Sequence, residues 1–448
     1  MVVTERAGAD ASTDSTTPTG FTPHSAPGAD RRPRGPGPAF GRFWGAYTAG
    51  NLADGMMLTA FPLVAALLTS DPLLVGGLTA VRFLPWLLFG IVSGAIVDRV
   101  DRVRAMRTVA LVRASAMGCL AVLLATGNAT IWALYAVMFA VMVCETVYDG
   151  AARAHVPTIV ARDRLDAANS RMEGGRVVTE DFGGAPVAGL LFGVAAALPV
   201  ATGGLAYLLS AVVLIAVPAT ARRVPEDEQA EGAGEERPPR RAVLRAVAAD
   251  TRDGFRYLAR NRVQAGLVGL TLGLGFGFQM ASSVLVLFVQ HELGVPAHLF
   301  GVFVSASAVG ALVGAAVASP LARRVSKRVL IVGGFVLAGL FLAAMGAMAS
   351  PWAAALIWGL VGAVLLMANA LGYAVLQAIT PNGLFGRVEG VRKALGWGLA
   401  PVGALLGGVL GRIDLAIPIV VGGLIIAAVT VVFHRAITGS VRLAEEAD

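Results

Sequence analysis

The chain has 448 residues, of which 56% are hydrophobic and only 15% are charged, and its mean hydropathy is +0.71. A soluble domain carries about a quarter charged residues, so this composition excludes an ordinary soluble protein and predicts a membrane protein with many spans. The formal net charge of +7 does not indicate nucleic-acid binding, because the basic residues gather in short loops between apolar segments.

Residues 1–38 are rich in Ser, Thr, Pro, Gly and Asp and contain no apolar run, which predicts a disordered tail and not a cleaved signal peptide. The first segment long enough to span a membrane is 43–67, since a helix needs roughly twenty residues to cross a hydrocarbon core of about 30 Å. Eleven further runs follow, at about 73–97, 106–126, 130–150, 169–193, 197–218, 263–290, 298–320, 328–349, 352–379, 389–411 and 414–434.

The arginines and lysines of the tails, loops and linker lie almost entirely on one of the two sides that this arrangement of spans defines. They concentrate in the N-terminal tail, in the loops after the second, fourth, eighth and tenth spans, in the central linker and in the C-terminal tail, whereas the opposite side has Arg412 alone. Basic loops face the cytoplasm. We therefore expect both termini and the linker to be cytoplasmic, in the plasma membrane of a bacterium.

The two halves of the chain repeat each other. The stretch 183–193 (GGAPVAGLLFG) aligns with 398–408 (GLAPVGALLGG), and 171–174 (RMEG) aligns with 387–390 (RVEG). A duplicated plan of six plus six helices is how secondary transporters build two bundles around a site in the middle of the membrane. We expect an all-α membrane protein with 12 transmembrane helices in two pseudo-symmetric six-helix bundles.

The expected domain boundaries follow from the changes in composition. They are a cytoplasmic tail at 1–38, an N-terminal bundle at 39–218, a cytoplasmic linker at 219–260, a C-terminal bundle at 261–436 and a cytoplasmic tail at 437–448. Within the linker, the apolar residues of 244–258 recur at helical spacing. This pattern predicts either an amphipathic helix on the membrane surface or an extension of the seventh span.

Charged residues inside the expected spans cost several kcal/mol unless they are paired or face water, so each requires a reason. Asp54 and Arg82 both fall near mid-depth and can form a pair, and Arg113 and Glu145 lie at a similar depth closer to the cytoplasm. Glu145, Asp149 and Arg153 share one helical face. We interpret this face mainly as a structural lock that bonds to Arg99 or Arg102.

The carboxyl groups Asp54, Glu180, Asp181 and Glu173 are the candidates for proton coupling. A desolvated carboxyl group whose partner can leave titrates near working pH and can carry a proton. Permanent ion pairs are the competing interpretation.

The spans of the second half of the chain carry few charges and are rich in glycine and aromatic residues instead. Its candidates for lining an apolar substrate cavity are Gln279, Met280, Phe276, Asn369, Gln377 and Trp397. Packing against lipid or inside the bundle is the alternative role of such residues.

The loop after the second span carries the most specific motif of the chain, namely Gly94, Asp98, Arg99, Asp101 and Arg102 in the pattern G-x-x-x-D-R-x-D-R. It resembles the loop between helices 2 and 3 of the major facilitator superfamily, in which glycine usually stands at the position of Asp101. The departure is common in the branch of macrolide-efflux-type and enterobactin-exporter-type proteins. In the fifth span, Ala185, Pro186 and Gly189 resemble part of an antiporter motif.

This resemblance implies a proton-coupled exporter of a drug, a macrolide, a siderophore or a self-made natural product, with the loop motif as a gating element. We expect the partners to be a small-molecule substrate, protons and the lipid bilayer, with no nucleic acid, and we expect a monomer. Neither a Walker motif nor H-E-x-x-H occurs, so we expect no enzyme activity, cofactor or metal. A lipid or lysolipid flippase of the same fold, or a membrane sensor that does not transport, remains the alternative.

Overall fold

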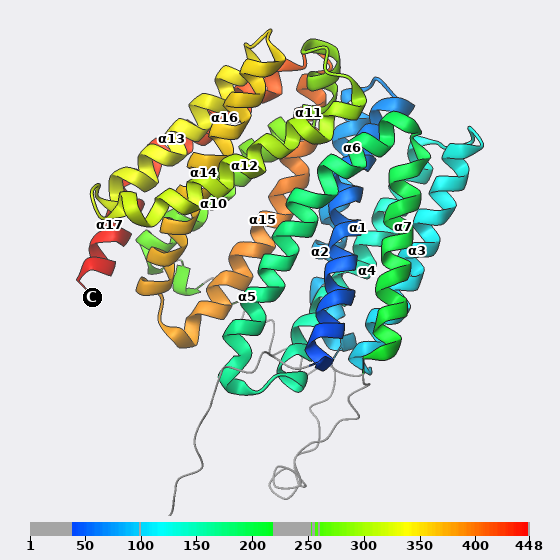
Figure 1. Cartoon of the computed structure of the whole chain (residues 1–448). Coiled ribbons are helices and arrows are strands. Elements are labelled where there is room, and N and C mark those ends of the chain that lie inside the picture. Colours follow the sequence, from blue (N-terminus) through cyan, green and yellow to red (C-terminus); the bar gives the residue numbers. More distant parts are fainter. Residues whose placement is uncertain (1–37, 98–99, 218–251, 253–255, 259, 447–448) are drawn as a thin grey trace, which may run out of the picture. The chain divides into compact units, whose positions relative to one another are not determined.

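The chain forms helices joined by short turns, as the computed structural model shows (Figure 1). The structure describes residues 38–97, 100–217, 252, 256–258 and 260–446. The helices of the first half are α1 (Pro38–Leu68), α2 (Pro72–Val97), α3 (Arg102–Ala125), α4 (Ile131–Ile159), η1 (Arg162–Arg164), α5 (Leu165–Arg176), η2 (Val177–Gly184), α6 (Ala185–Val194), α7 (Ala197–Val213) and η3 (Leu214–Ala216).

The second half repeats this sequence of long helices. It comprises α10 (Arg262–Ser282), α11 (Leu285–Leu287), η4 (Phe288–Glu292), η5 (Ala297–Leu299), α12 (Phe300–Ala322), α13 (Lys327–Gly346), α14 (Pro351–Ile379), α15 (Asn382–Gly411), α16 (Ala416–Val432) and α17 (His434–Glu445). Across the described residues, 11 helical spans are long and apolar enough to cross a membrane, and α16 with α17 passes the same test as a pair bent by 53°. The expected tally of twelve spans is therefore reached when this bent pair counts as one.

The fifth and twelfth spans depart from simple helices. The fifth consists of α5 and α6 joined by the π-helical segment η2. In a π-helix each backbone hydrogen bond spans five residues, whereas in an α-helix it spans four. At the end of the twelfth, residues 437–445, which we assigned from the sequence to the cytoplasmic tail, are helical. They belong to α17, which buries Ile437, Val441 and Ala444 against α10, α13 and α14. Their i, i+4, i+7 spacing is that of an amphipathic helix.

Most of the expected linker, 219–260, lies outside the described residues, as does the N-terminal tail up to residue 37. Of the apolar residues expected on its helix, Leu258 is described and is buried against Val388 and Val391 of α15. The position of the rest of that helix stays a prediction.

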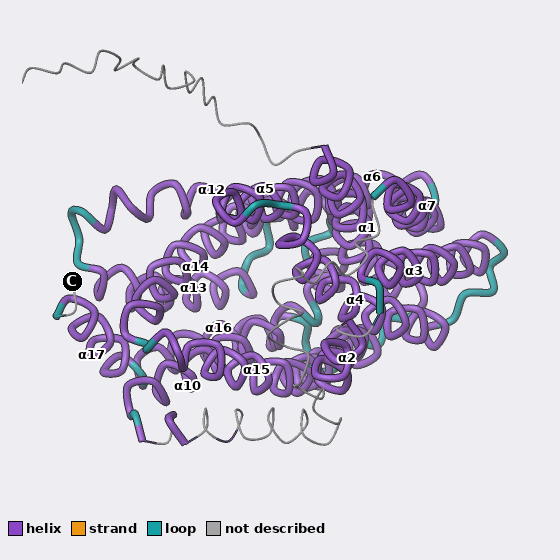
Figure 2. The backbone as a smooth tube through the Cα atoms, turned by 90° about the horizontal axis from the view of Figure 1, so that it is seen from below, coloured by secondary structure: helices purple, strands orange, loops and turns teal. Residues whose placement is uncertain are grey.

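Helix contacts divide the described spans into an N-terminal and a C-terminal set. In the first set α7 packs against α1 and α3, and α4 packs against α2 and α3; in the second set α14 packs against α12 and α13, and α16 against α10 and α13. The two sets meet along two seams, α2 with α15 and α6 with α12. Figure 2 shows α2 beside α15, and α6 near the end of the α5–α12 pair.

Glycines of the internal repeat form both seams. A side chain at Gly189 would overlap the backbone of Gly301 in α12, and one at Gly408 would overlap the backbone of Leu73 in α2. Only glycine permits this approach of backbone to backbone. The repeat that we recognised in the sequence therefore marks the surfaces by which each half contacts the other.

Candidate functional site

A single guanidinium group lies between two carboxyl groups in the interior of the N-terminal bundle. Arg113 of α3 is fully buried, and its Nη2 forms ion pairs with Oδ1 of Asp54 on α1 and, at 2.6 Å, with Oε2 of Glu145 on α4. Asp54 itself is only 8% exposed. A pair of Asp54 with Arg82 was possible from the sequence, but Asp54 pairs with Arg113 because α3 brings its arginine between α1 and α4.

Two tyrosines complete this cluster. The hydroxyl of Tyr207 on α7 donates to Oδ1 of Asp54 at 2.6 Å and accepts from Nη2 of Arg113 at 3.0 Å. Its ring lies under the guanidinium group with 4.1 Å from the ring centre to Cζ, and the ring of Tyr148 lies 5.6 Å away. Cation–π contacts of this kind stabilise a desolvated arginine. Within the described part of the chain, Nε and Nη1 of Arg113 and Oε2 of Glu145 have no hydrogen-bond partner, so the contact of Arg113 with Glu145 is an ion pair without hydrogen-bond geometry. The guanidinium group therefore keeps donors available for a different arrangement of the acids.

The cluster faces a cavity of about 240 Å³. Its lining includes Asp54 and Glu145 together with Arg82 of α2 and Glu180 of η2. The remaining wall is apolar, formed by Met57, Leu58, Phe83, Trp86, Met142 and Trp397. The acids are therefore paired and at the same time lie at the edge of a cavity, which a purely structural lock does not require.

Arg82 differs from Arg113 in its surroundings. It is half-buried, and its guanidinium carbon lies 5.5 Å from the ring centre of Phe83. Among the residues that the structure describes, no carboxyl oxygen forms an ion pair with it. An arginine inside a membrane protein without a fixed partner is a candidate for contact with a substrate or with a carboxylate that moves.

The other candidates for proton coupling lie on α5 and η2. Arg176 donates to Glu180 at 3.1 Å and to Glu173 at 2.8 Å, and Glu173 is largely exposed whereas Glu180 lines the cavity. Asp181 lies in η2, but its side chain falls outside what the structure describes. Gly55, next to Asp54, packs directly on the backbone of Glu180, where any side chain would overlap it.

The loop motif ties helices together at their ends. Asp101 caps α3 by accepting from the backbone N–H of Arg104 at 2.7 Å, and Arg102 donates to the carbonyl of Ala154 on α4 at 2.8 Å. The cap explains why an aspartate suits the position at which the resembling family has glycine, since both residues are favourable N-caps. Gly94 lies in α2, and Asp98 and Arg99 lie outside the described residues.

The face of Glu145, Asp149 and Arg153 does not act as one unit. Asp149 pairs with Arg153 on its own helix at 3.0 Å, whereas Glu145 pairs with Arg113. Among the described residues this face forms no bond to Arg102, which donates to the Ala154 carbonyl group instead, and the alternative partner Arg99 lies outside those residues, so a bond to it stays a prediction. The depth of Glu145, one turn further from the helix end than Asp149, separates the two acids.

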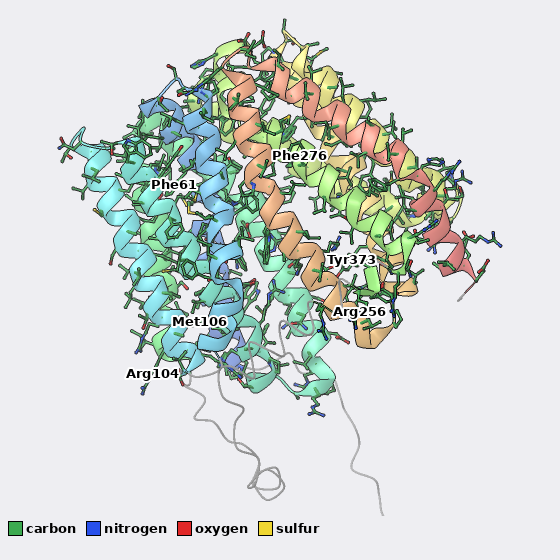
Figure 3. The ribbon with its side chains drawn as sticks, turned by 180° about the vertical axis from the view of Figure 1, so that it is seen from behind. Phe61, Arg104, Met106, Arg256, Phe276 and Tyr373 are labelled. Atoms are coloured by element: carbon green, nitrogen blue, oxygen red, sulfur yellow. The ribbon has the colours of Figure 1, made fainter. Side chains whose placement is uncertain are left out.

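The six candidates for lining a substrate cavity in the second half of the chain do not lie around one cavity. Trp397 lines the 240 Å³ cavity and faces Trp86 across the α2–α15 seam, with ring centres 5.1 Å apart, and Asn369 lines a second cavity inside the C-terminal bundle. Neither cavity is lined by the other four. Met280 and Phe276 pack against glycines of α15, Gln279 is half-buried and Gln377 is exposed. Figure 3 shows Phe276 and Tyr373 at different levels of this bundle.

Sequence reasoning missed Tyr207, Tyr148 and Trp86. Tyr207 interrupts an otherwise apolar and small-residue span, and a phenol in such a span needs a hydrogen-bond partner. That signal pointed to a buried acceptor but not to which one. No group of three or more His, Cys, Asp or Glu that could hold a metal occurs in the described ranges.

Helices arranged as two sets of spans, with an ion cluster at the edge of an internal cavity, define a membrane transporter of the six-plus-six type. Residues 37–448 match the model of the transmembrane secretion effector family, and the chain belongs to this family of the major facilitator superfamily. The family match makes it a membrane transporter of the major facilitator type.

Solved structures share the fold at low sequence identity. A mutant form of the nucleoside transporter NupG is 13% identical with a TM-score of 0.67, covering 90% of this chain and 99% of that chain. A bacterial homologue of the iron transporter ferroportin in an inward-facing state is 14% identical with a TM-score of 0.68, covering 89% and 98%. A bacterial homologue of the human lysosomal transporter Spinster is 15% identical with a TM-score of 0.61, covering 91% and 97%. No curated protein matches the chain significantly by sequence.

Proposed function

We propose that this transporter exports a small lipophilic molecule from the cytoplasm by alternating access, in exchange for protons. The observation that carries the proposal is the sharing of Arg113 by Asp54 and Glu145 at the edge of a cavity. The family's description as a secretion effector supports the outward direction. The basic loops support cytoplasmic termini in a plasma membrane.

The charge balance of the cluster is the first step of the argument. With both carboxyl groups ionised, the ion-paired set of Asp54, Glu145 and Arg113 carries a net charge of −1 in a buried setting, and Arg82 of the same cavity forms no ion pair with either acid among the described residues. An uncompensated charge inside a membrane costs roughly 3 kcal/mol or more. Binding one proton makes the cluster neutral, and the two acids titrate as a coupled pair and not separately.

The second step links the proton to the helices. Protonation of Asp54 weakens its bond to Arg113 and leaves the guanidinium group to Glu145 and Tyr207, so α1 is held less firmly to α3. Because Gly55 packs on the backbone of Glu180 in η2, a movement of α1 is transmitted to the fifth span. The π-helical segment η2 interrupts the α-helical hydrogen-bond pattern of that span, so the span can change its bend there.

The third step concerns the substrate. The cavity combines Trp86, Trp397, Phe83 and methionines with three carboxyl groups, so it suits an apolar molecule and particularly a lipophilic cation. Such a cation neutralises the same net charge that a proton neutralises. Competition between the two for one cluster is the simplest physical basis for exchange.

The test is transport by purified protein in liposomes with an imposed pH difference, using ethidium as a lipophilic aromatic cation. We expect wild-type protein to move ethidium in response to the pH difference. Asp54→Asn and Glu145→Gln should each reduce this coupled transport at least about tenfold, because the one remaining carboxylate then balances Arg113 and the cluster is neutral without binding a proton. Glu180→Gln, Asp181→Asn and Glu173→Gln test the remaining candidates.

Glu446→Gln is the matched control, since Glu446 is an exposed acid that pairs with Arg442 at the far end of α17. It should transport like wild type. Full coupling in both Asp54→Asn and Glu145→Gln would overturn the assignment of these carriers. Movement of a fluorescent lysolipid that needs no pH difference would favour a flippase instead.

A further inference from the structure

A second and larger cavity lies within the C-terminal bundle. Its volume is about 390 Å³, which is within the usual range for small-molecule sites. Residues of α10, α13, α14, α15 and α17 line it, and Ile331, Phe335, Ile437 and Ser440 show that it reaches behind α10 and α14. None of the residues that line the charged cavity of the N-terminal bundle takes part.

One wall of this cavity holds a buried acceptor without a donor. Gln264 of α10 is 1% exposed, and its Nε2 donates to Oγ1 of Thr380 at 2.9 Å. Thr380 uses its own proton for the carbonyl of Leu376 at 2.6 Å, so Oγ1 has to accept and the amide cannot be turned around. Within the described residues, Oε1 of Gln264 therefore remains without a partner.

An unsatisfied buried acceptor costs about 1–3 kcal/mol, and native proteins keep few of them. The other hydrogen-bonding groups of the lining do not reach Gln264, because Thr271 and Ser440 donate to carbonyl groups of their own helices. The hydroxyl of Tyr373 and the amide of Asn369 make no hydrogen bond within the part of the chain that the structure describes. The site thus offers polar atoms to a ligand.

The cavity carries no unmatched charge in its described lining. Arg392 is the one ionised side chain in the described lining of this cavity. Its Nε and Nη2 each donate to a carboxylate oxygen of Glu389 at 2.8 Å, and its guanidinium carbon lies 5.8 Å from the ring centre of Tyr373. The rest of the wall is made mainly of Leu, Val, Ile and Phe side chains. Asn369, Ala370 and Tyr373 are exposed, so α14 forms the entrance.

We propose that this cavity is a second ligand site, which binds a neutral, largely apolar molecule through a hydroxyl or amide N–H donated to Oε1 of Gln264. A charged ligand is disfavoured because the described lining holds no free counter-charge. The proposal does not depend on proton coupling, since Asp54 and Glu145 belong to the other cavity.

The test uses 2-naphthol, which carries a donor, and naphthalene, which does not. In protein with Cys119→Ser and Cys144→Ala, the substitution Ala370→Cys places a thiol at the entrance, and protection of this thiol from a maleimide reports occupancy. Measured in lipid nanodiscs, 2-naphthol should protect at a concentration about tenfold lower than naphthalene, after correction for partition into empty nanodiscs. Ser326→Cys, in the exposed α12–α13 turn, should be unprotected by either probe.

Gln264→Met keeps the shape of the side chain and removes the acceptor. It should abolish the preference for 2-naphthol while naphthalene still protects, and Thr380→Val should keep the preference because Oε1 is retained. Asp54→Asn should leave protection unchanged. Equal protection by both probes in wild type, as a lipid or detergent chain would produce, overturns the proposal, and so does a preference that persists in Gln264→Met.

Discussion

Asp71 and Arg412 form a two-point ion pair between residues 341 positions apart, with Nε and Nη2 of Arg412 donating to the carboxylate at 2.8 Å and 2.6 Å. Asp71 precedes α2 and Arg412 follows α15, so the pair joins the two bundles at one end of their seam. It lies on the face that has no other basic residue in its loops. We infer that it helps to hold this face closed.

Neutralising Asp71 should open this face more often. In protein with Cys119→Ser and Cys144→Ala, Leu73→Cys near the α15 backbone reports on opening, since the residue packs beside Gly408. We expect Asp71→Asn to increase the rate of labelling by a membrane-impermeant maleimide several-fold. The exchange of charges, Asp71→Arg with Arg412→Asp, should restore the slow rate; equal labelling in all three proteins would contradict the inference.

The same pair predicts a pH dependence. The hydrogen bonds from Arg412 hold the pKa of Asp71 below its ordinary value of 3.8. A lowered pKa means that the pair contributes at pH above that ordinary value and loses its contribution as the pH falls toward the lowered one. The rate of labelling itself falls with pH because the thiolate is the reacting species, so the rate for Leu73→Cys is divided by the rate for the same protein carrying Asp71→Asn. This ratio should be low and constant near neutrality and approach one only under strongly acidic conditions.

Removing the shared cation should be far more damaging than removing one acid. Arg113→Met leaves two buried carboxylates without a counter-charge, and we expect it to destabilise the protein by roughly 3–5 kcal/mol, measured by unfolding in detergent. Adding Asp54→Asn and Glu145→Gln should recover most of this loss, because the cluster is then neutral. If the triple variant were no more stable than Arg113→Met alone, the two acids would not be the cause.

The cap at Asp101 can be tested separately from gating. Asp101→Ala should cost about 1 kcal/mol because the N–H of Arg104 loses its acceptor, whereas Asp101→Gly should cost only a few tenths. Thermal unfolding checks the first change, and coupled transport by Asp101→Gly should stay close to wild type. A transport defect in the glycine variant would show that the carboxylate has a role beyond the cap.

Contact between the bundles along α6 and α12 requires a glycine. A methyl group at Gly301 would overlap the carbonyl of Ala185, and a backbone carbonyl cannot move aside cheaply. We expect Gly301→Ala to reduce transport strongly, as measured in the same liposomes. Gly118→Ala on α3 is the control, since nothing lies within 4 Å of its added methyl group. Similar transport by both variants would show that the seam tolerates the change.

The spans, their number and the internal repeat were predictable from the sequence, because hydrocarbon thickness imposes a length of apolar residues and the 183–193 and 398–408 copies need no structure to be seen. The intramembrane acids and arginines were equally visible, since a charge in an apolar run is conspicuous. The amphipathic α17 could have been predicted from the spacing of Ile437, Val441 and Ala444.

The partners of these charges were decided by tertiary structure alone. Depth along a helix is compatible with a pair of Asp54 with either Arg82 or Arg113. The packing of α3 between α1 and α4 makes Arg113 the shared cation and leaves Arg82 at the cavity. In the same way, the composition of α10 does not show that Gln264 lies against Thr380 with one oxygen unsatisfied. Helical periodicity determines depth and face within one span, whereas ion pairs and cavities depend on the rotation and neighbours of several spans, which no single segment encodes.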